Sequence, residues 1–155
     1  MARQAGRMRI LIDEDICVKR LASFLNYCSK SLGDVEFLAS TERFRGRPDS
    51  EWMVQEVKEG DVIITGDRSM STCQGTFENA QNHGLKVFML DPRISQQTRW
   101  HLVGWVISNM PAIIRASKQS QVGSLWFVDC DCRLTPVRRP RTKKRRQPPT
   151  TRLPS

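Results

Sequence analysis

Acidic side chains stand directly behind three apolar runs of this sequence. Asp13 follows the run "MRILI", Asp67 closes "DVIITGD", and Asp91 follows "KVFML". If each run is a buried strand of one parallel sheet, the three carboxylates lie at the same edge, where such sheets bind their ligands. Carboxylates held close together raise one another's pKa, so a fold keeps such a cluster mainly when cations neutralise it.

Metal-dependent hydrolysis is the chemistry that such a cluster could perform. Hard oxygen ligands suit Mg²⁺ or Mn²⁺, and a divalent ion can activate water and stabilise the charge of a phosphodiester transition state. The sequence contains no dinucleotide-binding glycine pattern, no Walker motif and no local signature of a Ser/His or Cys/His pair. A small-molecule or nucleotide enzyme that uses the same cleft is a further hypothesis.

Each acid also has an ordinary structural explanation. An Asp just after a strand is commonly a helix N-cap, and Asp91, which precedes Pro92, can simply shape a turn. Glu14 and Asp15 would lie in the first turn of a helix, where the macrodipole favours negative charge whatever the function. The prediction of a site therefore depends on the convergence of several strand ends.

The apolar runs alternate with segments of helical period. The expected strands cover 8–13, 34–40, 61–67, 85–92 and, as a short fifth strand, 124–130. The expected helices cover 16–28, 51–60, 95–116 and, as helical or irregular structure, 73–82. Gly33 and Gly60 are expected to end the first two helices, and Pro111 must kink the long one or start another. This alternation predicts one α/β domain with a mostly parallel sheet between layers of helices.

The excess positive charge is confined to the end of the chain. The formal net charge is +9, but residues 1–132 hold 16 basic and 16 acidic side chains, whereas residues 133–155 hold nine basic ones, no acid and five of the eight prolines. We expect a basic leader at 1–7, a folded domain at 8–132 and a disordered tail at 133–155. The tail could hold nucleic-acid phosphates non-specifically, or it could be a solubilising extension.

Five cysteines at irregular spacing, with no apolar stretch long enough to span a membrane, predict a reduced, soluble, cytoplasmic protein with no membrane partner.

The tryptophans and the arginines of one loop each have two interpretations. Trp52, Trp100 and Trp105 lie on predicted helices among apolar neighbours, which favours core packing over base stacking. The arginines of the 41–50 loop could grip an RNA backbone or could belong to a solvated, charged loop.

Four short motifs follow one another along the chain: "ILIDED", "RPDSEW", "VIITGDRSM" and "GLKVFMLDP". Their order resembles that of the PIN-like proteins, and it looks closest to the branch of uncharacterised bacterial domains and VapC45-type toxins. The resemblance covers about residues 8–136. Its sharpest parts are Asp-Glu after the first strand, Asp-x-Glu at a helix start and Thr-x-Asp-Arg after the third strand. Asp15 and Cys17 stand at or beside positions where the family usually has Asn and Pro.

The resemblance implies a three-layer α/β/α fold and a Mg²⁺- or Mn²⁺-dependent endoribonuclease, often the toxin of a type II toxin–antitoxin pair. Asp13 and Asp67 would then be the principal metal ligands, Asp49 and Glu51 would supply further carboxylates, and Arg68 could hold the scissile phosphate. Glu14 would be a supporting group. Candidate nucleic-acid contacts are Arg43, Arg45, Arg47, Arg138, Arg139, Arg141, Lys143, Lys144, Arg145 and Arg146.

The partners implied are RNA as substrate, a cognate antitoxin protein and a second copy of the chain as a homodimer. The altered turn after the first strand and the long basic tail keep a second function open. In that alternative the chain is a catalytically degenerate PIN-like module that binds nucleic acid or a protein through its basic tail.

Overall fold

The computed structural model describes residues 6–13, 19–39, 57–66, 68 and 74–138. Its strands are β1 (Met8–Ile12), β2 (Val35–Ala39), β3 (Val62–Thr65), β4 (Lys86–Leu90), β5 (Leu125–Val128) and β6 (Leu134–Pro136). Its helices are α1 (Lys19–Cys28), the 3-10 helix η1 (Lys30–Leu32), α4 (Gln74–Asn82), α5 (Pro92–Ser95) and α6 (Arg99–Gln119). Strands and helices thus alternate as the apolar runs predict.

The six strands form one sheet in the order β2-β1-β3-β4-β5-β6. The first five are parallel, and β6 pairs antiparallel with β5. The chain runs from β1 outward to β2 and then crosses to β3 on the other side of β1, so the direction of winding reverses between β1 and β3. In doubly wound sheets, the carboxyl ends of the two strands at such a switch point border the ligand crevice.

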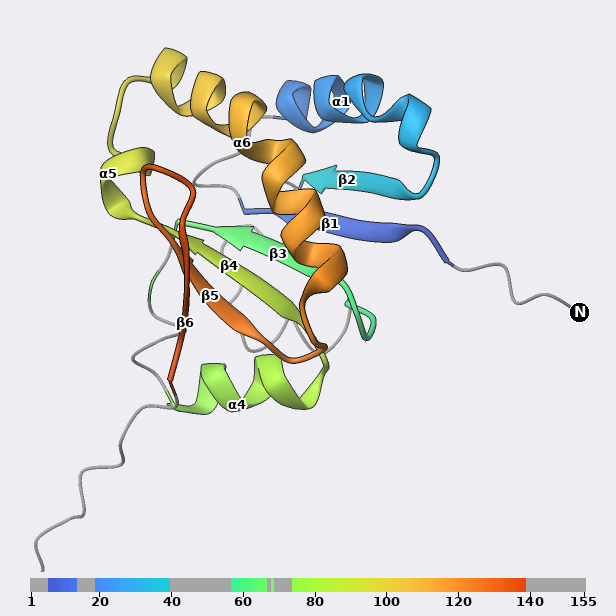
Figure 1. The fold of residues 1–155 in the computed structure, drawn as a ribbon, viewed down its shortest axis with the longest axis vertical. Helices are drawn as coiled ribbons and strands as arrows, with labels where there is room; N and C mark the ends of the chain where they lie inside the picture. The colour runs from blue at the N-terminus through green and yellow to red at the C-terminus, as the bar shows by residue number, and fades with distance from the viewer. Residues whose placement is uncertain (1–5, 14–18, 40–56, 67, 69–73, 139–155) are drawn as a thin grey trace, which may run out of the picture.

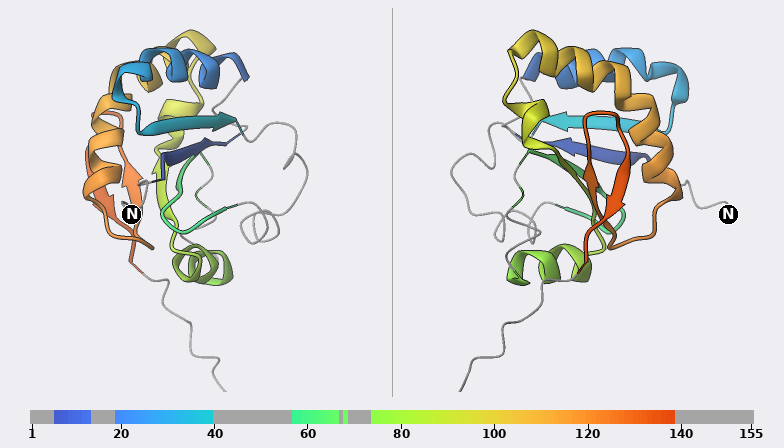
Figure 2. Two further views of the ribbon diagram at one scale, coloured as in Figure 1. Left: turned by 90° about the vertical axis from the view of Figure 1, so that its right-hand side faces the viewer. Right: turned by 60° about the vertical axis from the view of Figure 1, so that its left-hand side comes forward.

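Helices cover both faces of this sheet, as Figures 1 and 2 show. On one face, Ile12 and Ile64 belong to a core cluster that also holds Leu25 of α1 and Val106 of α6. On the other face, the alternate strand residues pack in a second cluster with α4; its members include Leu11, Ile63, Val87, Met89, Phe77 and Ala80. Successive side chains of a strand point to opposite faces, so these strands are apolar throughout. The expected three-layer α/β/α fold with a mostly parallel sheet is confirmed.

The long C-terminal helix differs from its prediction at its start. The segment after β4 forms a short helix, α5, and α6 begins separately at Arg99 with Thr98 as its N-cap. Pro111 lies inside α6, and Figure 1 shows that the helix bends along its course. A proline removes one helical hydrogen bond, so a bend within one helix, and not a second helix, accommodates it. None of the helices in the described ranges is long and apolar enough to cross a membrane.

Two glycine-terminated segments end differently from the prediction. Residues 51–56 of the expected 51–60 helix lie outside the described residues, and 57–60 are not helical but end in a turn. Gly60 has φ +86° and its N–H donates to the Gly84 carbonyl at 2.9 Å, which ties this turn to the one before β4. Gly33, with φ +67°, caps η1, not α1. Both glycines therefore end a segment, but the helix predicted up to Gly60 is wrong over its last turn.

The edge strand β6 was not predicted. Asp129 builds the tight turn before it, because its Oδ1 accepts the N–H groups of Asp131 at 2.9 Å and Arg133 at 2.8 Å. Residues 134–136 then pair with β5. The boundary expected at 132 is therefore too early, since this hairpin adds a strand from the first residues of the basic segment. Residues 139–155 lie outside the described residues.

The prediction that the tryptophans pack in the core has a different outcome for each of them. Trp105 is partly buried against the core, and its Nε1 donates to the Cys130 carbonyl at 2.8 Å. Trp100 is 89% exposed, so the prediction that it packs in the core is wrong. The buried stripe of α6 runs through Leu102 and Val106, and two residues correspond to about 200° around a helix, which turns Trp100 to solvent. Trp52 lies outside the described residues.

Candidate active site at the carboxyl edge of the sheet

Asp13 lies at the switch point between β1 and β3. It is the first residue after β1, and its N–H donates to the Ile64 carbonyl at 2.9 Å, which continues the hydrogen-bond ladder one step past the strand. The Thr65 hydroxyl, at the end of β3, donates to Asp13 Oδ2 at 2.7 Å. Thr65 is 1% exposed, whereas Asp13 is partly exposed. A buried hydroxyl therefore orients a carboxylate that solvent can still reach.

This contact fixes a negative charge at the place where doubly wound folds bind ligands. A hydrogen bond to a carboxylate is shorter and stronger than one between neutral groups, and an oriented carboxylate is a good ligand for a hard cation. Thr65 belongs to the Thr-x-Asp-Arg motif, but no role was predicted for it, because a Thr at that position also fits an ordinary β-former. The useful signal was a polar side chain at the end of a strand that is otherwise wholly apolar.

Arg68 lies farther along the same edge, towards β5. Its guanidinium carbon is 4.8 Å from the centre of the Phe127 ring, within the range of a cation–π contact. The residue itself is exposed. The aromatic ring thus supports a cation that remains accessible at the carboxyl side of the sheet.

Asp91 has a structural role. It is the N-cap of α5, and its Oδ1 accepts the Arg93 N–H at 2.9 Å. The Arg93 side chain also pairs with it, with Nη2 2.8 Å from Oδ2. Hydrogen bonds from the side chain and then the backbone of Arg93 lower the pKa of Asp91 to about 2, and the charge of Arg68 adds a smaller contribution. The explanation of Asp91 as a cap is therefore confirmed.

Most of the other predicted site residues lie outside the described residues. These are Glu14, Asp15, Arg43, Arg45, Arg47, Asp49, Glu51, Asp67, Arg139, Arg141, Lys143, Lys144, Arg145 and Arg146. Arg138 is described and is exposed. Within the described ranges, no group of three or more His, Cys, Asp or Glu side chains is placed to hold a metal ion. Of the four predicted metal ligands Asp13, Asp49, Glu51 and Asp67, Asp13 is the one that lies within the described residues.

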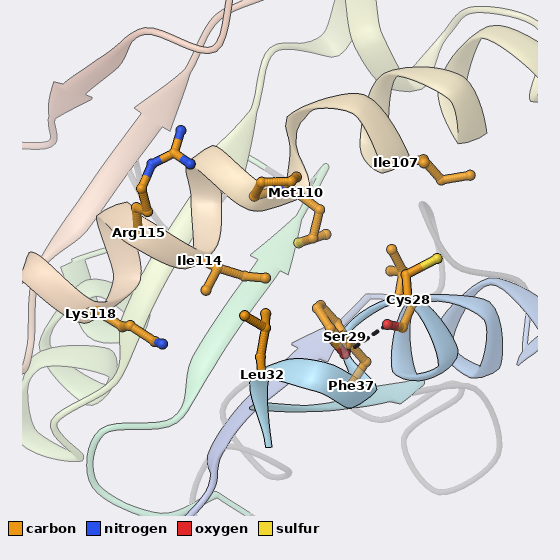
Figure 3. Close-up of a pocket in the computed structure, with 11 residues that line it drawn as sticks. Cys28, Ser29, Leu32, Phe37, Ile107, Met110, Ile114, Arg115 and Lys118 are labelled. Atoms are coloured by element: carbon orange, nitrogen blue, oxygen red, sulfur yellow. Dashed lines mark hydrogen bonds between the residues drawn. The ribbon is translucent and has the colours of Figure 1, made fainter. Parts of the chain in front are cut away.

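A pocket of about 260 Å³ lies elsewhere, between the α1–η1 segment and α6 (Figure 3). Apolar side chains dominate its lining, among them Leu32, Met110 and Ile114. Lys118 stands at one end, where its Nζ is 2.7 Å from Asp34 Oδ2. None of the described residues that line the pocket is acidic, so this lining suits an apolar guest better than hydrolytic chemistry.

The fold and the edge described above define an α/β protein of the doubly wound class, with a carboxylate at its switch point. A family model described as "PIN like domain" matches residues 8–92, which is more than half of the chain. The chain therefore belongs to the PIN-like domain family, a group whose members are commonly nucleases. No curated protein and no solved structure gives a significant match.

Proposed function

We propose that the chain is a Mg²⁺- or Mn²⁺-dependent endoribonuclease whose active site is the carboxyl edge between β1 and β3. Membership of a family with many nucleases supports the reaction class. The observation that carries the proposal is the Asp13 carboxylate, held by the Thr65 hydroxyl at the switch point of the sheet.

Four carboxylates would hold the ion. Asp13 and Asp67 would be the principal ligands, and Asp49 and Glu51 would supply further carboxylates. An ion bound there would lower the pKa of water and neutralise charge on the scissile phosphate. The donor set is all oxygen, which suits Mg²⁺ and Mn²⁺ better than softer metals.

Two other side chains would orient the metal ligand and neutralise charge on the substrate. Thr65 would hold Asp13 in the orientation that leaves its carboxylate towards solvent, as outer hydrogen-bond partners of metal ligands usually do. Arg68, which the Phe127 ring supports, would hold a phosphate oxygen. This positive charge matters because a phosphodiester would otherwise approach an edge that carries carboxylates.

The test is cleavage of a labelled single-stranded RNA by the purified chain with Mn²⁺, with EDTA as the metal-free control. Asp13→Asn and Asp67→Asn should each slow cleavage by at least about 100-fold, because several kcal/mol of transition-state stabilisation depend on the ion. Asp34→Asn is the matched control, since Asp34 precedes β2 at the opposite edge and pairs with Lys118. Unchanged cleavage by both Asp13→Asn and Asp67→Asn would refute the proposal.

We further propose that the chain acts in the cytoplasm as the toxin of a type II toxin–antitoxin pair, in the branch of VapC45-type toxins. Two observations favour a protein partner: the apolar pocket between α1 and α6, and two exposed aromatic side chains of α1, Phe24 and Tyr27, which are 46% and 76% exposed. An apolar segment of an antitoxin would cover this surface. Expression of the chain should arrest growth, and Asp13→Asn should restore it.

A non-catalytic role is the alternative. The observation that favours it is the run of nine basic and no acidic side chains in residues 133–155, which could bind nucleic-acid phosphates without any chemistry. In that case a chain that lacks Arg138 to Ser155 would lose RNA binding, and the full chain would show no metal-dependent cleavage. Retained, strongly salt-dependent binding by the shortened chain would contradict this alternative.

A further inference from the structure

A nearly fully exposed tryptophan stands at the start of α6. Trp100 is 89% exposed, the highest value among the large apolar side chains that are described as exposed. Leaving so large an apolar ring in water forgoes a sizeable hydrophobic contribution, and nothing in the packing of α6 requires a Trp there, because the buried stripe of the helix lies on its other side. A ligand that covers the ring would account for the residue type.

One exposed cation stands directly beside this ring along the chain. Arg99 precedes Trp100 and is exposed. Arg93 on α5 is also exposed, but its guanidinium is paired with Asp91. An aromatic face next to a cation is a combination with which proteins bind single-stranded nucleic acid, where the ring stacks on a base and the cation contacts a phosphate.

The position of the ring is suited to a substrate of the proposed site. Helix α5 follows β4 at the carboxyl edge of the sheet, and α6 begins a few residues later. Figures 1 and 2 show α5 and the start of α6 on the side to which the arrowheads of the parallel strands point. A strand of RNA that crosses this edge could therefore reach both Asp13 and the start of α6.

We propose that Trp100 stacks on an unpaired base of a single-stranded RNA substrate while Arg99 contacts its backbone. This proposal rests on the proposed nuclease function for the identity of the ligand. Stacking on Trp100 would make the site selective for unpaired over duplex RNA, because bases within a duplex are already stacked. It implies little sequence preference at that nucleotide, since every base has a face that can stack.

The test is the affinity for a fluorescein-labelled, unstructured RNA of about ten nucleotides, within the usual site sizes, measured by anisotropy in EDTA so that no cleavage occurs. Trp100→Ala should raise the Kd roughly 5- to 150-fold, the loss of one stacked base. Trp100→Phe should recover most of the affinity. Tyr27→Ala is the matched control, because this aromatic is 76% exposed on α1 and should leave the Kd unchanged.

The salt dependence separates the two kinds of contact. Arg99→Ala should lower the slope of log Kd against log salt by about 0.7, as the loss of one phosphate contact on a single strand does. Trp100→Ala should leave that slope unchanged, because stacking releases no counterion. An equal Kd for Trp100→Ala and the unsubstituted chain would overturn the proposal, as would a monomer–dimer shift in Trp100→Ala with no change in RNA affinity.

The outcomes also separate this proposal from the nuclease function. If Trp100→Ala binds RNA normally while Asp13→Asn abolishes cleavage, the stacking proposal is wrong and the nuclease function stands. If Trp100→Ala weakens binding but the chain does not cleave RNA with Mn²⁺, stacking stands and the nuclease function is wrong. Because Trp100 is 89% exposed and belongs to neither core cluster of the described residues, thermal unfolding of the alanine variant should match that of the unsubstituted chain.

Discussion

Replacing Thr65 by Val tests the contact on which the candidate site is built. The change removes the hydroxyl that donates to Asp13 Oδ2 at 2.7 Å and fills nearly the same volume, so it leaves little cavity. A hydrogen bond to a charged group stabilises a fold by about 1.5 to 3 kcal/mol. Asp13 is partly exposed, so water can replace part of the bond, and we expect a loss near 1.5 kcal/mol, about a tenfold smaller folding constant.

The measurement is urea unfolding at pH 7. The Thr65→Val midpoint should fall with no change in the slope m, because the surface exposed on unfolding is the same. A double-mutant cycle with Asp13→Ala isolates the contact, and the coupling between the two substitutions should be about 1 to 2 kcal/mol. A coupling below about 0.5 kcal/mol, the usual error of additivity, would refute the reasoning.

The same variant has a second readout under the proposed function. Loss of an outer partner of a metal ligand typically costs 10- to 100-fold in metal affinity or activity, so Thr65→Val should weaken Mn²⁺ binding and RNA cleavage by that amount. Thr65→Ser keeps the hydroxyl and is the matched variant, which should retain both within a few-fold. Equal Mn²⁺ affinity of the Val and Ser variants would show that Thr65 does not position the ligand.

Two further predictions concern the described fold. Arg93→Ala should raise the pKa of Asp91 from about 2 towards its usual 3.8, and a ¹³C NMR titration would show the change. In the unsubstituted chain, the low pKa of Asp91 stabilises the fold above about pH 4. This stabilisation is lost as the pH falls towards 2. Gly84→Ala should destabilise the fold more than Gly33→Ala: both have φ +67°, but only a Cβ at 84 would meet Val122, at 2.6 Å. Each change should cost at least about 1 kcal/mol, and equal thermal unfolding of the two variants would contradict the second prediction.

The layers of the fold were predictable because parallel strands buried on both faces must be apolar throughout. The run 62–65 is buried at every position, and such a run, repeated between helical segments, leaves few alternatives to a parallel sheet. Strand β6 was not predictable in the same way. It is three residues long, partly exposed, and lies in a basic, proline-rich segment, so neither periodicity nor composition marks it, and its pairing depends on the Asp129 turn.

The candidate site was predictable in part for a different reason. A carboxylate directly after an apolar strand has a fixed place in a parallel sheet, which is why Asp13 could be assigned to the edge. Sequence could not show the contacts of either acid: the Thr65 hydroxyl of the neighbouring strand donates to Asp13, whereas the backbone and side chain of Arg93 donate to Asp91. The exposure of Trp100 was missed because an aromatic near an apolar stripe is usually part of it.

A crystal structure of the chain soaked in Mn²⁺ tests the central claim most directly, because anomalous scattering locates the ion without reference to activity. The account predicts an ion at the carboxyl end of β1, about 2.0 to 2.3 Å from an Asp13 carboxylate oxygen, with at least one of Asp49, Glu51 and Asp67 also bound to it. An ordered Asp13–Thr65 pair with no ion at millimolar Mn²⁺, or an ion held elsewhere in the molecule, would contradict it.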